Sequence, residues 1–223
     1  MQPTAFHTPR LRTRRLIFLL GIFACGAATA ASFKAADCIR YRQLLHAEDA
    51  QSARLLWVSL EKSAAHQQPI LLLQTLLAAL VLVLFFKWVA LSAYRTKQFA
   101  PQAFSWTPRR AVWGFLLPLL NAYQPYLVLR DLLRTALGKN FNLFHHILLG
   151  IWSLFWIMAL IGLIAIFHQS STIATLSQLG ARSFASALAY FAMMGTALLT
   201  AALVKRISSA QTQSNQHGNR SAR

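Results

Sequence analysis

The chain has 223 residues, of which 56% are hydrophobic and 12% are charged, and its mean hydropathy is +0.44. A soluble domain usually carries about 25% charged residues. The apolar residues here form long blocks instead of recurring at a helical or strand period, so the composition excludes an ordinary soluble domain and predicts an integral membrane protein.

Basic residues dominate the charge: 22 Lys and Arg stand against five Asp and Glu, a formal net charge of +17. They flank the apolar blocks, and no basic soluble domain remains once those blocks are set aside. The charge therefore indicates membrane topology and contact with anionic phospholipid headgroups, and it argues against nucleic-acid binding.

The first apolar run, residues 16–33, follows a basic segment at residues 1–15 that we expect in the cytoplasm. Two interpretations compete for this run. The basic start and the Ala-Thr-Ala sequence at 28–30 fit a cleavable signal peptide. Small residues every four positions predict instead the packed face of a retained helix, which we favour because the run is long enough to span. These small residues are Gly21, Cys25 and Thr29.

Residues 34–68 are predicted to be a polar, helix-prone loop that holds four of the five acids. Within it, Asp49 is a plausible N-cap for a short helix. Pro69 suits the first turn of the next segment, and the almost wholly apolar residues 69–91 predict a second span.

Residues 147–167 and 185–204 predict two further spans. The last is Ala-rich, with Ala185, Ala189, Ala197 and Ala201 at close-packing spacings. Its polar continuation, residues 207–223, is predicted to be a disordered tail.

Residues 111–129 are long enough to span but are interrupted by Pro118, Asn121, Gln124 and Pro125. If this segment crossed, the basic residues of 130–139 would lie outside together with Lys205 and Arg206, against the positive-inside rule. If it enters and leaves on one side, residues 92–143 and both termini are cytoplasmic. We therefore predict an all-α integral membrane bundle of four spans (membrane domain 16–206) plus a Pro-broken re-entrant or interfacial segment.

A Trp and a Tyr-Arg pair end one predicted helix, within FKWVALSAYR at 86–95. A Thr-Pro, an aromatic-rich apolar run, Pro-x-x-Asn, Pro-Tyr and an acid-containing helix follow at 105–134. This pattern resembles the bacterial domain-of-unknown-function family 4328, and the likeness extends from the first span to LVKRISSAQ at 203–211. Arg109-Arg110 replaces a less charged pair, and Asp131 stands where Glu is usual. The resemblance implies a multi-span membrane protein without an assigned activity. The matching positions are Trp88, Tyr94, Arg95, Pro108, Trp113, Pro118, Asn121, Pro125, Tyr126, Arg130 and Asp131.

The broken segment is the first candidate site. In one interpretation, its freed carbonyls and the Asn121 amide line a polar cavity, as in the broken helices of transporters. In the other, Asn121 satisfies backbone groups released by Pro118 and Pro125 in a kinked helix, which we favour.

The second candidate site is a set of charged residues that could contact a lipid headgroup or a partner protein. Arg130 and Arg134 lie one helical turn apart and so share a face. In the competing interpretation, Asp131 pairs with these arginines at a helix surface and the other basic residues are topology signals. The set consists of Arg95, Arg109, Arg110, Arg130, Asp131 and Arg134.

No phosphate loop, metal-ligand cluster or nucleophile elbow occurs, and the adjacent His145 and His146 lack accompanying ligands. We therefore expect no enzyme activity, no cofactor and no metal. The leading hypothesis is a non-enzymatic, multi-pass component of the bacterial inner membrane that contacts lipid, a protein partner or a second copy of itself. The alternative is a small transport or channel module with its path at the Pro118–Pro125 break. A lipid-modifying enzyme that uses Asp131 is the weakest hypothesis.

Overall fold

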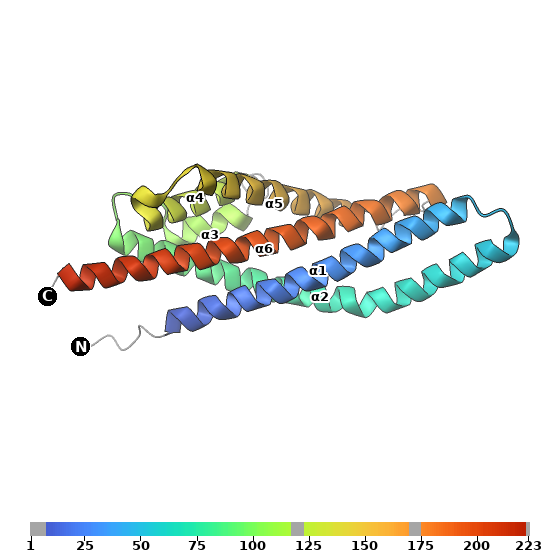
Figure 1. Ribbon diagram of the computed structural model, residues 1–223, viewed down its shortest axis with the longest axis horizontal. Helices are drawn as coiled ribbons and strands as arrows, with labels where there is room; N and C mark the ends of the chain where they lie inside the picture. The colour runs from blue at the N-terminus through green and yellow to red at the C-terminus, as the bar shows by residue number, and fades with distance from the viewer. Residues whose placement is uncertain (1–7, 117–122, 170–174, 222–223) are drawn as a thin grey trace. The chain divides into compact units, whose positions relative to one another are not determined.

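The computed structural model describes residues 8–116, 123–169 and 175–221, and this part of the chain is helical without a strand (Figure 1). Four helices are long and apolar enough to cross a membrane, which confirms the predicted all-α fold with four spans. The described elements are α1 (Thr8–Leu45), α2 (Ala50–Phe99), α3 (Pro108–Leu116), α4 (Gln124–Leu137), the 3-10 helix η1 (Gly138–Asn140), α5 (Leu143–Gln169) and α6 (Leu176–Ser221). The four candidate spans are α1, α2, α5 and α6.

The long helices extend well beyond the predicted spans. α2 alone has 50 residues, whereas about 20 suffice to cross the hydrocarbon core. The predicted loop at 34–68 is therefore wrong, because α1 continues to Leu45 and α2 begins at Ala50. The N-cap prediction for Asp49 is confirmed, since its Oδ1 accepts a hydrogen bond from the Ser52 backbone N–H at 2.6 Å.

Pro69 lies inside α2 and not in a first turn, so that prediction is also wrong. A proline within a helix lacks the N–H that would bond the carbonyl four residues earlier. Pro69 and Ala65 are both on the exposed side of α2, where that carbonyl is not shut inside the packed core.

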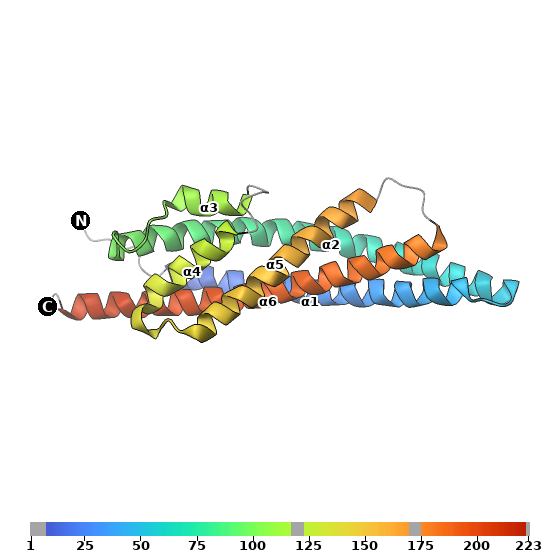
Figure 2. The same cartoon turned by 90° about the horizontal axis from the view of Figure 1, so that it is seen from above.

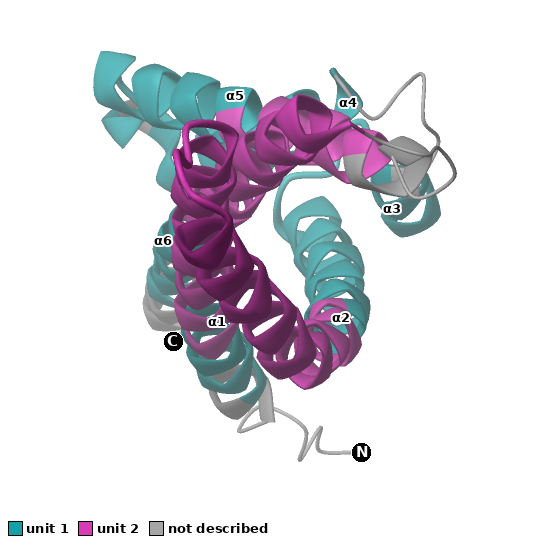
Figure 3. Cartoon of the chain, turned by 90° about the vertical axis from the view of Figure 1, so that its right-hand side faces the viewer, with its two compact units in different colours: residues 1–21, 79–154, 197–223 teal, residues 22–78, 155–196 magenta. Residues whose placement is uncertain are grey.

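The chain divides into two compact units, coloured separately in Figure 3. Unit 1 comprises residues 1–21, 79–154 and 197–223, and unit 2 comprises residues 22–78 and 155–196. Each candidate span contributes residues to both units. The two ends of the described chain, in α1 and α6, both belong to unit 1.

Within unit 1, aromatic side chains join α2 to α3. The Phe85 and Phe115 rings meet edge to face with centroids 5.3 Å apart, and Trp88 stacks on Phe85 at 6.0 Å. Edge-to-face and offset contacts at such distances are the favoured aromatic geometries. α4 adds an apolar face of fully buried side chains, Val128, Leu129, Leu132 and Leu133.

The broken segment forms two short helices, α3 and α4, that belong to unit 1 and pack against each other (Figure 2). The approach is close, because a Cβ on Gly114 would lie 2.8 Å from Gln124 Oε1. Pro125 is buried in the first turn of α4. Pro118 and Asn121 lie outside the described residues. Neither helix is among the candidate spans, in agreement with the four-span prediction.

Gly138 ends α4 with φ 54°, a left-handed conformation that glycine adopts without steric cost. Its N–H bonds the Arg134 carbonyl one turn back. This glycine with positive φ ends α4 where the chain turns through η1 into α5.

Within unit 2, small residues let α5 and α6 approach closely. A Cβ on Gly162 would overlap the Cβ of Ala189 and lie 3.0 Å from its Cα. The predicted packing role is confirmed for Ala189, which is 2% exposed, and in unit 1 for Ala197, which is 3% exposed. Such contacts drive helix association in membranes, where the hydrophobic effect does not.

The predicted packed face of the first helix is wrong. Cys25 and Thr29 are exposed, and a Cβ on Gly21 would meet nothing within 4 Å. The buried stripe lies on the neighbouring face instead, because its alanines are as small as the predicted residues and carry no polar group. It consists of Leu16, Leu20, Ala24, Ala27 and Ala30.

The start of the predicted disordered tail is helical in the structure, because α6 continues through Ser221. Ile207 is fully buried and Ala210 nearly so. Gln211 Nε2 donates to Thr96 Oγ1 at 3.0 Å and to the Ser92 carbonyl at 3.3 Å. The polar composition of this stretch thus serves hydrogen bonds to α2 and does not prevent folding.

Candidate functional site

The two units differ sharply in charge. The unit 1 ranges hold sixteen of the 22 basic residues and one acid, whereas the unit 2 ranges hold six basic residues and four acids. Asp131 is the single acid of unit 1. Almost all of the net positive charge is therefore gathered in one unit.

Asp131 is already engaged by its neighbours. Its Oδ1 accepts from Arg130 Nη2 at 2.8 Å and Nε at 3.0 Å, and its Oδ2 accepts from Trp106 Nε1 at 2.9 Å. The Arg110 guanidinium lies over the Trp106 ring, 5.4 Å from its centroid. The competing interpretation of this set as a surface ion pair therefore fits Arg130 and Asp131, which tie α4 to the segment before α3.

Arg109 and Arg134 are exposed, and no ion pair joins either to an acid in the described part of the chain. Neither lines a described cavity. They add positive charge to the surface of unit 1 without defining a site.

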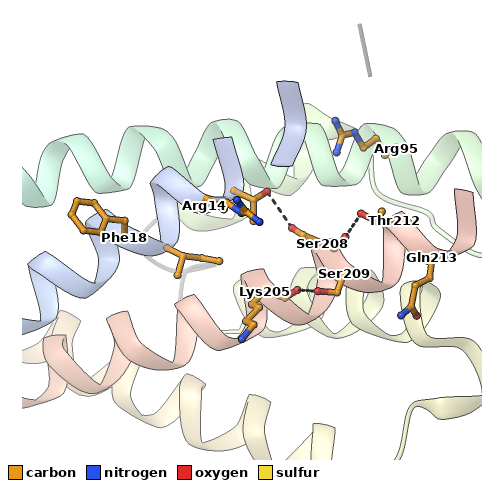
Figure 4. Close-up of a pocket in the computed structure, with 10 residues that line it drawn as sticks. Arg14, Phe18, Arg95, Lys205, Ser208, Ser209, Thr212 and Gln213 are labelled. Atoms are coloured by element: carbon orange, nitrogen blue, oxygen red, sulfur yellow. Dashed lines mark hydrogen bonds between the residues drawn. The ribbon is translucent and has the colours of Figure 1, made fainter. Parts of the chain in front are cut away.

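A cavity of about 790 Å³ opens between the unit 1 parts of α1, α2 and α6 (Figure 4). One basic residue from each helix lines it: Arg14, Arg95 and Lys205. The other lining residues have hydroxyl, amide or apolar side chains, and none of them is an acid. The remaining lining residues are Thr13, Ile17, Phe18, Ser208, Ser209, Thr212 and Gln213.

Hydrogen bonds centred on Ser208 fix the three walls. Its Oγ accepts from Trp88 Nε1 of α2 at 3.2 Å and lies 3.4 Å from Thr13 Oγ1 of α1. The two bonds of Gln211 add a second link between α6 and α2 one turn further on. Hydrogen bonds at Ser208 and at Gln211 thus join the helices that form the cavity.

Charge in this cavity is not balanced from within the protein. No described acid forms an ion pair with Arg14, Arg95 or Lys205. Arg14 and Lys205 are exposed, whereas Arg95 is half-buried. Guanidinium and ammonium groups donate strongly to carboxylate and phosphate oxygens, so the arrangement suits an anion.

His145 contacts Arg206, the residue of α6 that follows Lys205. Arg206 Nη1 lies 3.0 Å from His145 Nε2, and His145 Nδ1 lies 2.6 Å from Asn142 Oδ1. A guanidinium can only donate, so Nε2 accepts from Arg206. The Asn142 backbone N–H also lies 3.3 Å from Nδ1. The Phe144 ring lies 5.0 Å from the Arg206 guanidinium carbon. Among the described residues no group of three or more His, Cys, Asp or Glu side chains is placed to hold a metal.

The structure brings together few of the residues predicted from sequence. Of the six charged candidates, only Arg95 lines the cavity. Gln124 and Pro125 take part in the contact of α3 with α4 and line neither described cavity.

Sequence reasoning missed the partners of Arg95 on α1 and α6. A signal for two of them exists, because Arg14 precedes the first apolar run and Lys205 follows the last one. In a four-span chain these two ends lie on the same side. The missed lining residues with polar groups are Thr13, Arg14, Lys205, Ser208, Ser209, Thr212 and Gln213.

Fold and site together define an all-α protein with four helices able to cross a membrane and a basic cavity at the unit that contains both chain ends. The family described as "Domain of unknown function (DUF4328)" matches residues 52–209, and the chain belongs to this family. The match confirms the resemblance from α2 to Ser209 and does not include the first span. No curated protein and no solved structure matches the chain.

Proposed function

We propose that this chain is a non-enzymatic, multi-pass component of the bacterial inner membrane whose unit 1 faces the cytoplasm and contacts anionic phospholipid headgroups. The observation that carries the proposal is the charge of unit 1, with sixteen basic residues and one acid. Cytoplasmic segments near span ends carry an excess of Lys and Arg. Juxtamembrane basic clusters are attracted to the anionic lipids of the cytoplasmic leaflet.

The arrangement of the ends supports this orientation. Four crossings return the chain to its starting side, and both described ends lie in unit 1 together with α3 and α4. The turn between α1 and α2, which carries Glu48 and Asp49, belongs to unit 2. In a four-span chain this turn is then on the side opposite the two ends.

A non-enzymatic role is favoured over lipid chemistry at Asp131. Both carboxylate oxygens of Asp131 accept hydrogen bonds, from Arg130 and from Trp106. A carboxylate held as a structural ion pair is poorly placed to take a proton from a substrate. The transport alternative has less support, because Gln124 and Pro125, the described residues of the break, line neither of the two described cavities.

The test is the lipid preference of the purified, folded chain. We expect its melting temperature in detergent to rise on addition of phosphatidylglycerol and to change little with phosphatidylcholine, because only the former headgroup has a net negative charge. A ligand present at 100 times its Kd raises the free energy of unfolding by about 2.7 kcal/mol. Equal responses to the two lipids would contradict a preference for anionic headgroups.

A further inference from the structure

We infer that the cavity between α1, α2 and α6 binds the phosphate of a single anionic phospholipid, with part of an acyl chain along Ile17 and Phe18 (Figure 4). This inference rests on the proposed function, because it assigns one defined site to a general contact with anionic lipid. The ligand chemistry is a phosphate ester, and the membrane lipid is the source that the cavity favours.

The first argument is the charge of the cavity walls. Arg14, Arg95 and Lys205 come from three helices, and no acid lines the cavity. Asp131, the one acid of unit 1, is bound by Arg130 and Trp106. A phosphate supplies the missing negative charge and several acceptor oxygens for guanidinium and ammonium donors.

The second argument is that one of two neighbouring hydroxyl groups keeps a hydrogen that can bond a ligand. Ser208 Oγ and Thr13 Oγ1 share one contact at 3.4 Å, to which only one of the two hydroxyls can donate. Trp88 Nε1 also donates to Ser208 Oγ and uses none of its hydrogen. One hydroxyl hydrogen of this pair can therefore turn to a phosphate oxygen.

Two further hydroxyls of the cavity are held only by local bonds. Ser209 Oγ donates to the Lys205 carbonyl at 2.7 Å, and Thr212 Oγ1 donates to the Ser208 carbonyl at 2.8 Å. Hydrogen bonds from a Ser or Thr hydroxyl to the carbonyl of the preceding helical turn are weak. Each hydroxyl can therefore turn and donate to a charged acceptor instead. The lining supplies donors of both charged and neutral kinds.

The third argument is the order of residues along the spans. Arg14 stands two residues before the first apolar run and Lys205 directly follows the last one, so both lie where headgroups are expected. Ile17 and Phe18 lie one step into the apolar run, and the Phe18 side chain is 68% exposed. A ligand with an anionic head and an apolar chain fits both ends of this cavity, whereas a soluble phosphate fits only one.

The experiment counts retained lipid on the full chain by native mass spectrometry, after equilibration with phosphatidylglycerol. Arg14→Gln and Lys205→Gln remove exposed charges and should fold normally, which thermal melts would check. We expect each variant to bind the lipid about five-fold more weakly and the double variant at least ten-fold more weakly. Arg134→Gln is the matched control, because it removes an exposed charge of unit 1 that lines neither cavity.

Two arms separate lipid from free phosphate. We expect Phe18→Ala to weaken lipid binding, and inorganic phosphate at millimolar concentration not to displace the lipid. Displacement by inorganic phosphate together with an indifferent Phe18→Ala would overturn the lipid as the ligand. If the double variant keeps wild-type lipid binding while the wild type still prefers phosphatidylglycerol over phosphatidylcholine, the cavity is the wrong site and the proposed function stands. Loss of that preference in the wild type would refute both.

Discussion

Single carboxylates serve two different purposes in this protein. Asp131 stabilises tertiary packing, by joining Arg130 of α4 to Trp106 before α3. Asp49 acts locally, as the N-cap of α2, and its pKa is lowered chiefly because the Ser52 backbone N–H bonds the charged form. The Ser52 side chain lowers that pKa further. The role of Asp49 is predictable from sequence because its partner is three residues away, whereas Trp106, the partner that gives Asp131 its tertiary role, is 25 residues away.

Asp49 makes a pH prediction with a definite sign. A carboxyl whose pKa is lowered in the fold contributes stability that is present above its unfolded pKa and is lost as the pH falls through its folded pKa. NMR titration of the detergent-solubilised chain should give a midpoint for Asp49 below 3.8. Asp49→Asn keeps an acceptor that does not titrate, so its melting temperature should fall less than that of the wild type on acidification through this range. A midpoint at or above 3.8 would show that the cap does not form.

At the scale of elements, the contact of α5 with α6 depends on residues without side-chain bulk. Gly162 faces Ala189, and Gly195 faces the Phe155 ring, whose Cδ1 would lie 2.6 Å from an added Cβ. Membrane helices can approach this closely only where side chains are small. The contact is therefore sensitive to a single added methyl group.

Gly162→Ala should destabilise the fold by about 1–2 kcal/mol, because the destabilisation from overpacking exceeds the stabilisation from the higher helix propensity of alanine. Gly150→Ala on the same helix is the control: its Cβ would meet nothing within 4 Å, so propensity alone should make it neutral or stabilising by up to about 1 kcal/mol. Unfolding in a detergent titration measures both variants. Equal effects at the two positions would show that α5 and α6 do not meet at Gly162.

The existence of the four long helices could be predicted from their apolar runs, but their extent could not. Residues 34–68 read as a loop because polar residues replace apolar ones. In the fold, Asp37 of α1 accepts hydrogen bonds from Ser63 and Gln67 of α2 at 2.9 and 2.7 Å, so polar groups occupy the buried face. The cavity could not be predicted from the sequence for a related reason. Arg14, Arg95 and Lys205 come from three separate spans, and no local spacing relates them.

At the scale of the whole molecule, the division of charge agrees with the path of the chain. Unit 1 contains the described ends of α1 and α6, the connection from α2 to α3 and the turn from α4 to α5. Unit 2 contains the turn from α1 to α2 and the connection from α5 to α6. The connections of unit 1 are strongly basic, and residues 168–184 around the α5–α6 connection of unit 2 have Arg182 alone, as the positive-inside rule expects of a four-span protein. The α1–α2 turn departs from this pattern, because five basic residues of residues 34–68 flank it.

Cysteine labelling tests this topology. In a background with Cys25 and Cys38 replaced, exposed single cysteines at Gln98 and Asn140 of unit 1 should react with an impermeant reagent only in inverted vesicles. Cysteines at Gln51 and Ser177 of unit 2 should react only in intact spheroplasts. Reaction of Gln98 and Asn140 from opposite sides would mean that the α3–α4 segment crosses, giving five spans.

The concentration of positive charge in unit 1 also bears on handling the protein outside a membrane. With Asp131 as its one internal counter-ion, this unit repels itself whenever its surroundings supply no anions. A neutral detergent at low ionic strength supplies few anions, whereas about 0.1 M salt shortens the screening length to roughly 10 Å. The conditions of purification therefore act directly on the stability of unit 1, and far less on that of unit 2, whose four acids nearly match its six basic residues.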